Sequence, residues 1–370
     1  MREPDAVVGG RVQTAVLCLS MVACQLAVVS DAAAGRCPGW NIGTAEERGP
    51  IEHEAVDESS GLVLGSGGEL FWTHNDSGGE PQLFLFDRSG GHAGTVRLKT
   101  GEMVDWEDIA RGPCQPGGDA VCLYVGDIGD NEASRSRSVI YKLREPDLPT
   151  RRPFEFRIDD VRAVPFVYPD GPVDAETLMV APRTARLYVV EKSKSTPVGV
   201  YHVPNTPGAA DQPVRAEEVG EVSLPHVVPF GRTATAGAIS PDGGTIVVRS
   251  YLRIFTFCRS EGQSVPEALA DGATPSPSPA LPQAEAVAFG RSDRRLWLTS
   301  EKRPARLVRL SRQRDRPDRE PAANRDRKSA ATGDASDGEG CASSRGRRGA
   351  VFVLVGIVAV VYRRGAWLEQ

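Results

Sequence analysis

The feature that most constrains the fold is a unit of several short strands that recurs along the chain. Each unit begins with an apolar strand and continues through a turn into a second strand that ends in polar residues. The first strands are anchored at Ser60, Glu107, Glu176, Gly237 and Glu285, which gives spacings of 47, 69, 61 and 48 residues. A period of this length with several strands per unit indicates the blades of a β-propeller.

Turn and composition signals support the same fold class. Segments such as 87–91 and 240–244 carry the Asp and Gly residues that tight turns favour. With 39 Gly and 28 Pro, the composition argues against a helical bundle. We expect an all-β protein with a six-bladed β-propeller, or seven blades, and a β-sandwich is the alternative. Five such units can be identified in the sequence. We expect strands such as 52–56 and 153–164 to complete a sixth blade and close the ring of blades.

One segment interrupts the repeat. Residues 265–282 include alternating Pro and Ser and read as a long exposed loop. We expect one short helix in it, over Val265–Ala270.

The N-terminal region, residues 1–36, reads as an export signal. It has a weakly basic start, an apolar stretch over 14–23 and a small-residue cleavage site at 32–34. Lipidation at Cys24 is the alternative. The propeller body is then expected to span residues 37–310.

The C-terminal region divides into two parts. Residues 311–348 lose apolar periodicity and are expected to form a disordered linker. Residues 349–370 contain the apolar stretch 350–361 and a following pair of arginines. At about 1.5 Å per residue this stretch covers about 18 Å, less than the roughly 30 Å hydrocarbon core. We expect a transient sorting span, with a simple tail anchor as the alternative.

Gly340 and Cys341, a polar gap, a short apolar segment and the arginine pair resemble the myxobacterial C-terminal sorting signal MYXO-CTERM. The resemblance covers about the last 30 residues. It implies that Cys341 is the processing and anchoring point, that a sorting protease is a partner, and that the protein reaches the cell surface or outer membrane. Arg345 before the apolar stretch and the final GAWLEQ depart from the pattern.

The cysteines agree with export. Four of the seven fall in the body, an even number suited to an oxidising compartment. Cys114 and Cys122 bracket a turn-rich loop and are expected to pair, and a Cys37–Cys258 bond would then tether the N-terminus of the body. No Cys-x-x-Cys pair is present, which argues against zinc.

Acidic residues recur at the start of the first strands. Asp105 and Glu107, Asp174 and Glu176, and Gln283 and Glu285 share one spacing. Residues two apart on a strand point to the same face, and the first strands of a propeller line its channel. The ends of the second strands lie at the same end of the channel. The predicted metal ligands are Asp105, Glu107, Asp127, Asp174, Glu176 and Glu285, and the predicted binding residues are His74, Asn75, Asp76, Lys192 and Arg249.

Crowded carboxylates must be protonated, paired with a basic residue or bridged by a cation. Oxygen ligands with few His suit Ca²⁺ or Mg²⁺, so Ca²⁺ is the expected cofactor if one binds. The alternative is that these acids are structural and pair with Lys192 and Arg249. The nearby residues Asp127, Asp130 and Asn131 form either a turn or a loose calcium loop, and the EF-hand spacing is absent.

The charge distribution argues against nucleic acid. The whole chain has a formal net charge of −5. Segment 311–348 carries +3, the last 22 residues carry +1 and residues 1–36 are balanced, so the body carries −9. An acidic body is compatible with divalent cations and repels anionic polymers.

Asn75 to Gly78, Asp105 to Ala110, and Asp174 to Glu176 resemble exported bacterial six-bladed propellers. They are distantly similar to the esterase-like phytase and SMP-30-type lactonase propellers. The enzymatic relatives imply a channel-mouth metal held by Glu107, Glu176, Glu285 and Asp127. We expect a surface-anchored module that binds a small molecule or a surface protein. The alternative is a metal-dependent hydrolase of phosphoesters or lactones.

Overall fold

The computed structural model describes residues 41–313 apart from 102, 207–211, 227 and 292–294. These residues form five β-sheets with mainly antiparallel strand pairing, which we number as blades 1 to 5 along the chain. From the innermost strand outward, the strands of the first two blades are β2(Ser59–Leu64), β3(Leu70–Asn75), β4(Gln82–Asp87), β5(His92–Leu98) and β9(Phe154–Ile158) for blade 1, and β6(Trp106–Pro113), β7(Val121–Asp127), β8(Ser138–Arg144), β10(Val161–Val167) and β14(Val214–Arg215) for blade 2.

The remaining blades have four strands each. From the inside outward they are β11(Ala175–Val180), β12(Leu187–Glu191), β13(Val198–Val203) and β15(Glu217–Val222) for blade 3; β16(Ala236–Ile239), β17(Thr245–Arg249), β18(Arg253–Cys258) and β19(Thr274–Pro277) for blade 4; and β20(Ala286–Phe289), β21(Arg295–Thr299), β22(Arg306–Gln313) and β1(Asn41–Pro50) for blade 5. Two short helical segments complete the described structure, η1(Pro229–Gly231) and α1(Val265–Ala270).

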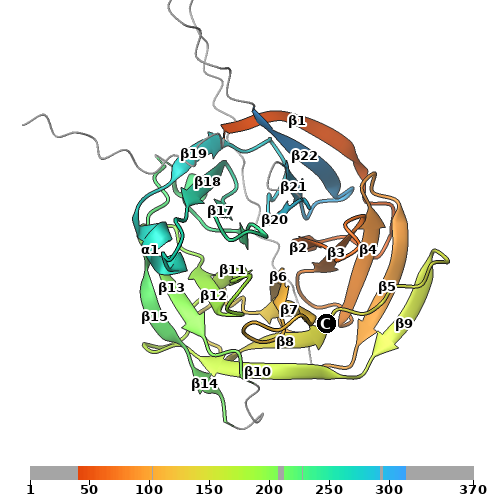
Figure 1. The fold of residues 1–370 in the computed structure, drawn as a ribbon, viewed down its shortest axis with the longest axis horizontal. Coiled ribbons are helices and arrows are strands. Elements are labelled where there is room, and N and C mark those ends of the chain that lie inside the picture. Colours follow the sequence, from red (N-terminus) through yellow and green to blue (C-terminus); the bar gives the residue numbers. More distant parts are fainter. Residues whose placement is uncertain (1–40, 102, 207–211, 227, 292–294, 314–370) are drawn as a thin grey trace, which may run out of the picture. The chain divides into compact units, whose positions relative to one another are not determined.

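The innermost strands form a closed ring. Strand β2 lies beside β6, β6 beside β11, β11 beside β16, β16 beside β20, and β20 beside β2 again. Figure 1 shows the sheets arranged radially around this ring. The described part of the chain is therefore a β-propeller, as the repeat predicted. The predicted number of six blades is wrong, because the described residues form five.

Of the two segments expected to build a sixth blade, residues 153–164 join other blades instead. Strand β9 adds to the outer edge of blade 1, parallel to β5, and the chain then returns to blade 2 as β10. Strand β14 makes a similar excursion from blade 3 to pair in parallel with β10. Residues 52–56 form a turn before β2. These outer strands cover edges that would otherwise be open to pairing with other chains.

The two ends of the described chain meet in blade 5. Strand β1 pairs with β22 in an antiparallel register that places Glu46 opposite Arg309. A side-chain ion pair between these two residues accompanies the backbone pairing. Ring closure by the termini was predicted, and the structure realises it in blade 5.

The core lies between blades rather than within any one of them. Five clusters of buried apolar residues each join two neighbouring blades, and the cluster between blades 5 and 1 packs Trp297 against Phe71. The central strands are therefore buried on both faces, which explains continuous apolar runs such as Leu187–Val190. Outer strands alternate, and in β9 Phe154 and Phe156 are more buried than Glu155 and Arg157.

The interrupting segment is more ordered than its sequence indicated. Helix α1 forms at the expected residues, where Ser264 and Glu267 make a reciprocal capping box. Residues 274–277, expected in an exposed loop, form β19 and close the outer edge of blade 4. No helix in the part of the chain described here combines the length and apolarity needed to cross a membrane.

The predicted Cys114–Cys122 disulfide is present and links the far ends of β6 and β7. Cys258 is also disulfide-bonded, but Cys37 lies outside the described residues, so their pairing stays a prediction. The export signal, Cys24, Cys341 and the C-terminal apolar stretch also lie outside the described residues.

Candidate functional site

The inner strands of the blades all begin at one end of the ring, which we call the acidic mouth. Glu107 on β6, Glu176 on β11 and Glu285 directly before β20 have exposed fractions of only 3%, 2% and 4%. The negative charges of Asp76 and Glu285 both act on Glu107, although the three residues belong to different blades. The arrangement of blades thus gathers carboxylates from distant parts of the chain.

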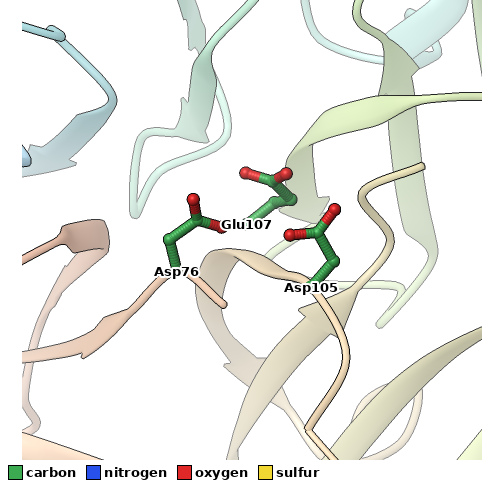
Figure 2. Close-up of side chains that lie close together, drawn as sticks. All are labelled: Asp76, Asp105 and Glu107. Carbon is green, nitrogen blue, oxygen red and sulfur yellow. The ribbon is translucent and has the colours of Figure 1, made fainter. Parts of the chain in front are cut away.

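Asp76, Asp105 and Glu107 form the tightest group in the acidic mouth. Each offers one oxygen, and these three oxygens lie within 4.8 Å of one another. Asp76 follows β3, whereas Asp105 and Glu107 lie at the start of β6, and Figure 2 shows their carboxylates turned toward a common space. The amide of Trp106 donates a 2.9 Å hydrogen bond to the carbonyl of Asp76, which fixes the two chain segments to each other.

Gly129 makes this close approach possible. A Cβ atom at position 129 would lie 2.3 Å from both Asp105 Oδ2 and Glu107 Oε1. The backbone of Gly129 also donates a 3.3 Å hydrogen bond to the carbonyl of Asp105. Only glycine leaves room for both carboxylates at this point.

The three carboxylates disfavour one another's ionised state. Burial, together with the charges of Asp105, Glu285 and Glu58, raises the pKa of Asp76 to about 8. Burial is also the main cause that raises the pKa of Asp105, and burial with the charges of Asp76 and Asp105 raises the pKa of Glu107 well above its usual range. Asp76 Oδ1 is buried and has no hydrogen-bond partner among the described residues. The group therefore retains protons at neutral pH unless a positive charge takes their place.

A divalent cation can replace these protons. Ca²⁺ binds carboxylate oxygens at about 2.3–2.6 Å, so two oxygens on one ion can lie up to about 5 Å apart. The 4.8 Å limit on the three oxygens meets that condition. All three donors are hard oxygen atoms, which match Ca²⁺ rather than zinc.

A second acidic pair lies beside this group. Tyr251 donates a 2.9 Å hydrogen bond to Glu285 Oε1, and the Gln283 side-chain amide donates to Glu301. Burial and a hydrogen bond with Glu285 raise the pKa of Glu301 to about 10. Glu301 therefore carries a proton at neutral pH, and its side chain is hydrogen-bonded to Glu285.

Other predicted ligands already have partners. Arg135 forms a 2.7 Å ion pair with Asp127, which also accepts hydrogen bonds from the amides of Val104 and Asp105. Lys192 forms an ion pair with Glu176. Asp174 Oδ1 accepts a 2.8 Å hydrogen bond from the amide of Asp130, which lies 44 residues earlier in the chain. Of the six predicted metal ligands, only Asp105 and Glu107 join the tightest group.

Three predicted binding residues have structural surroundings instead. His74 is fully buried, packs edge-on against Trp106, and burial lowers its pKa to about 4, so it is neutral. Asn75 donates to the carbonyl of Ala55 and to Asp57. Arg249 is fully buried and donates to the carbonyls of Ala286 and Thr299. Asp76 is thus the predicted binding residue that reaches the carboxylate group.

Sequence reasoning did not assign a role to Tyr251, Gly129 or Asp108. Asp108 is almost fully buried and accepts hydrogen bonds from the amides of Ile109 and Leu178, joining blades 2 and 3. It falls in the Asp105–Ala110 motif, so its acidity was visible in the sequence. Nothing in the local pattern pointed to Tyr251, because its contact with Glu285 spans two blades.

Comparison with known proteins adds two solved structures of low similarity. No protein-family model matches the sequence, and no curated protein matches it. The chain is similar to the PQQ-bound aldose sugar dehydrogenase of Streptomyces coelicolor, with 13% identity, coverage of 72% of this chain and 98% of that chain, and a TM-score of 0.37. It is also similar to a gluconolactonase of Xanthomonas campestris, with 11% identity, coverage of 74% and 91%, and a TM-score of 0.41. The fold assignment rests on the five sheets themselves.

Proposed function

We propose that this protein is a binding module whose ligand site is the acidic mouth, organised by a Ca²⁺ ion on Asp76, Asp105 and Glu107. The observation that carries the proposal is the group of three carboxylate oxygens within 4.8 Å, together with the unpartnered, buried Asp76 Oδ1. A bound cation would neutralise these charges and offer open coordination positions to oxygen atoms of a ligand.

Calcium titration of the chelator-treated protein tests the proposal. We expect one Ca²⁺ per chain by isothermal titration calorimetry at pH 8, and a higher melting temperature with Ca²⁺ than with chelator. Glu107→Gln should weaken Ca²⁺ binding at least about tenfold, because it removes a ligand charge. Glu261→Gln, which changes an exposed acid in the turn after β18, is the matched control. A protein that takes up no Ca²⁺ and melts identically with chelator would contradict the proposal.

A metal-dependent hydrolase is the second candidate, and the Glu285–Glu301 pair favours it. A buried carboxyl group that keeps its proton at neutral pH can act as a general acid beside a cation that serves as a Lewis acid. Lys192 is paired with Glu176, so the mouth offers little free positive charge for a phosphoester. A neutral lactone suits this mouth better than a phosphoester does.

Turnover separates the two candidates. A binding module should hydrolyse neither lactones nor nitrophenyl phosphate with Ca²⁺ present. A hydrolase should turn over a lactone, and Glu301→Gln should lower kcat while Ca²⁺ binding persists. Lactone turnover lost in Glu301→Gln but retained in Glu261→Gln would replace the binding role with the hydrolase.

We also propose that the protein is exported and displayed at the cell surface or outer membrane. The proposal is supported by the N-terminal signal pattern and by the Gly340–Cys341 sorting motif. Mass spectrometry of the mature protein should find an N-terminus close to Ala34 and a C-terminus processed at Cys341. Cys341→Ala should release the protein from the membrane fraction, and unchanged retention would contradict anchoring at this residue.

A further inference from the structure

A cavity of about 370 Å³ lies at the end of the inner strands opposite to the acidic mouth. The C-terminal parts of β2, β6, β11, β16 and β20 all contribute to its wall. Its volume falls in the range of roughly 300–1,000 Å³ that small-molecule sites occupy. None of the residues of the acidic mouth lines it, so it is a separate site.

The wall of this cavity is mostly apolar, and its charged residues in the described part of the chain are basic. Aliphatic side chains such as Leu62, Ile109 and Leu178 and the ring of Phe289 form most of the lining. Among the lining residues that the structure describes, Arg111 and Arg291 are charged and none is a carboxylate.

The two arginines differ in how their charge is balanced. Arg111 forms a 2.7 Å ion pair with Glu145, whose side chain is 5% exposed. Arg291 is exposed and donates to the carbonyl oxygens of Ser66 and Gly67. Within the described ranges it has no carboxylate partner. Among the described residues, the rim therefore carries one positive charge, that of Arg291, with no carboxylate paired to it.

We propose that this cavity binds a medium-chain alkyl carboxylate, with the alkyl chain against the aliphatic wall and the head group at Arg291. An apolar wall would accept an alkyl tail by the hydrophobic effect, and the guanidinium favours a carboxylate that can take two hydrogen bonds from it. The site does not depend on the acidic mouth or on Ca²⁺.

A homologous ligand series tests the apolar part of the proposal. We expect octanoate, decanoate and dodecanoate, each below its micelle concentration, to bind with one-to-one stoichiometry by isothermal titration calorimetry. Affinity should rise about fourfold for each methylene buried, until the cavity is full. Dodecyltrimethylammonium has the same tail with a positive head group and should bind far more weakly. Equal binding of the two head groups, or no dependence on chain length, would overturn the proposal.

Variants test the location. Arg291→Gln should weaken dodecanoate binding about fivefold, as expected for loss of an exposed charge pair. Ala238→Leu places extra volume at a small, half-buried lining residue and should abolish binding. Arg157→Gln, on outer strand β9, is the matched control. Glu107→Gln in the acidic mouth should bind dodecanoate as the wild type does, so failure of either proposal can be recognised separately. Wild-type affinity in both Arg291→Gln and Ala238→Leu would refute the site.

Discussion

Lys192 forms an ion pair with Glu176 inside the acidic mouth, where the two side chains are 18% and 3% exposed. The second oxygen of Glu176 is buried and has no partner among the described residues. The charge of Lys192 also favours ionisation of Glu107 in blade 2. One amine thus compensates carboxylates on two neighbouring blades.

Removal of this amine should be costly. Lys192→Gln leaves Glu176 without its partner, and loss of one member of a buried pair destabilises proteins by about 3–5 kcal/mol. Because Lys192 is partly exposed, we expect about 2–3 kcal/mol in urea unfolding. The double variant Lys192→Gln with Glu176→Gln should recover most of the loss, and additive losses would show that the two side chains are not coupled.

Without Ca²⁺, stability should depend on pH through Asp76. The pKa of Asp76 is about 8 in the folded protein, against about 3.9 in an unfolded chain. The folded state therefore binds more protons between these values, so the contribution of Asp76 to stability is lost as pH rises from about 4 to about 8. Asp76→Asn should flatten the melting temperature in that range when chelator is present.

Calcium should reverse this trend in the wild type. The ion competes with protons for the same oxygens, so the rise in melting temperature caused by Ca²⁺ should grow between pH 6 and pH 8. A calcium effect that is constant over this range would show that the ion binds away from Asp76.

Substitution at Gly129 should damage the carboxylate group with little other change. In Gly129→Ala the new Cβ would meet Asp105 and Glu107 at 2.3 Å, so at least one carboxylate must move. We expect Ca²⁺ affinity to fall at least about tenfold, measured by titration calorimetry. Gly67→Ala is the control, because a Cβ there meets nothing within 4 Å. Equal affinity in the two variants would separate Gly129 from the cation site.

The Cys114–Cys122 disulfide should make a moderate contribution to stability. It closes a short loop with a sequence separation of 8. A loop of this size corresponds to roughly 2–3 kcal/mol in the chain-entropy account of disulfides. Replacement of both cysteines by Ala should lower the free energy of unfolding by that amount in urea, with Ca²⁺ affinity unchanged because the bond lies far from the mouth. An unchanged urea midpoint would contradict this expectation.

The sequence predicted the inner half of each blade better than the outer half. All five anchors, from Ser60 to Glu285, lie on or directly before an inner strand. The number of blades was overestimated, because the local patterns of β9 and β10 mark strands without identifying their partners. Parallel pairing across blades depends on contacts distant in sequence, which a local pattern does not encode.

The site was predictable to a similar degree. Convergence of Asp105 and Glu107 with Asp76 followed from strand direction and from the position of the first strands. Which carboxylates lack a partner did not follow, because Arg135 reaches Asp127 from a loop and Tyr251 reaches Glu285 from the adjacent blade. Burial also removed His74 and Arg249 from the ligand face, and a single sequence gives no measure of burial at these positions.

The pairing of β1 with β22 has a consequence for folding during synthesis. The strand that completes blade 5 is made first, and its partner, residues 306–313, is made more than 250 residues later. Until residues 306–313 have been synthesised, β1 has no partner strand in blade 5, so the ring of blades cannot close. Such long-range closure slows folding, because the two strands must meet across nearly the whole length of the described chain.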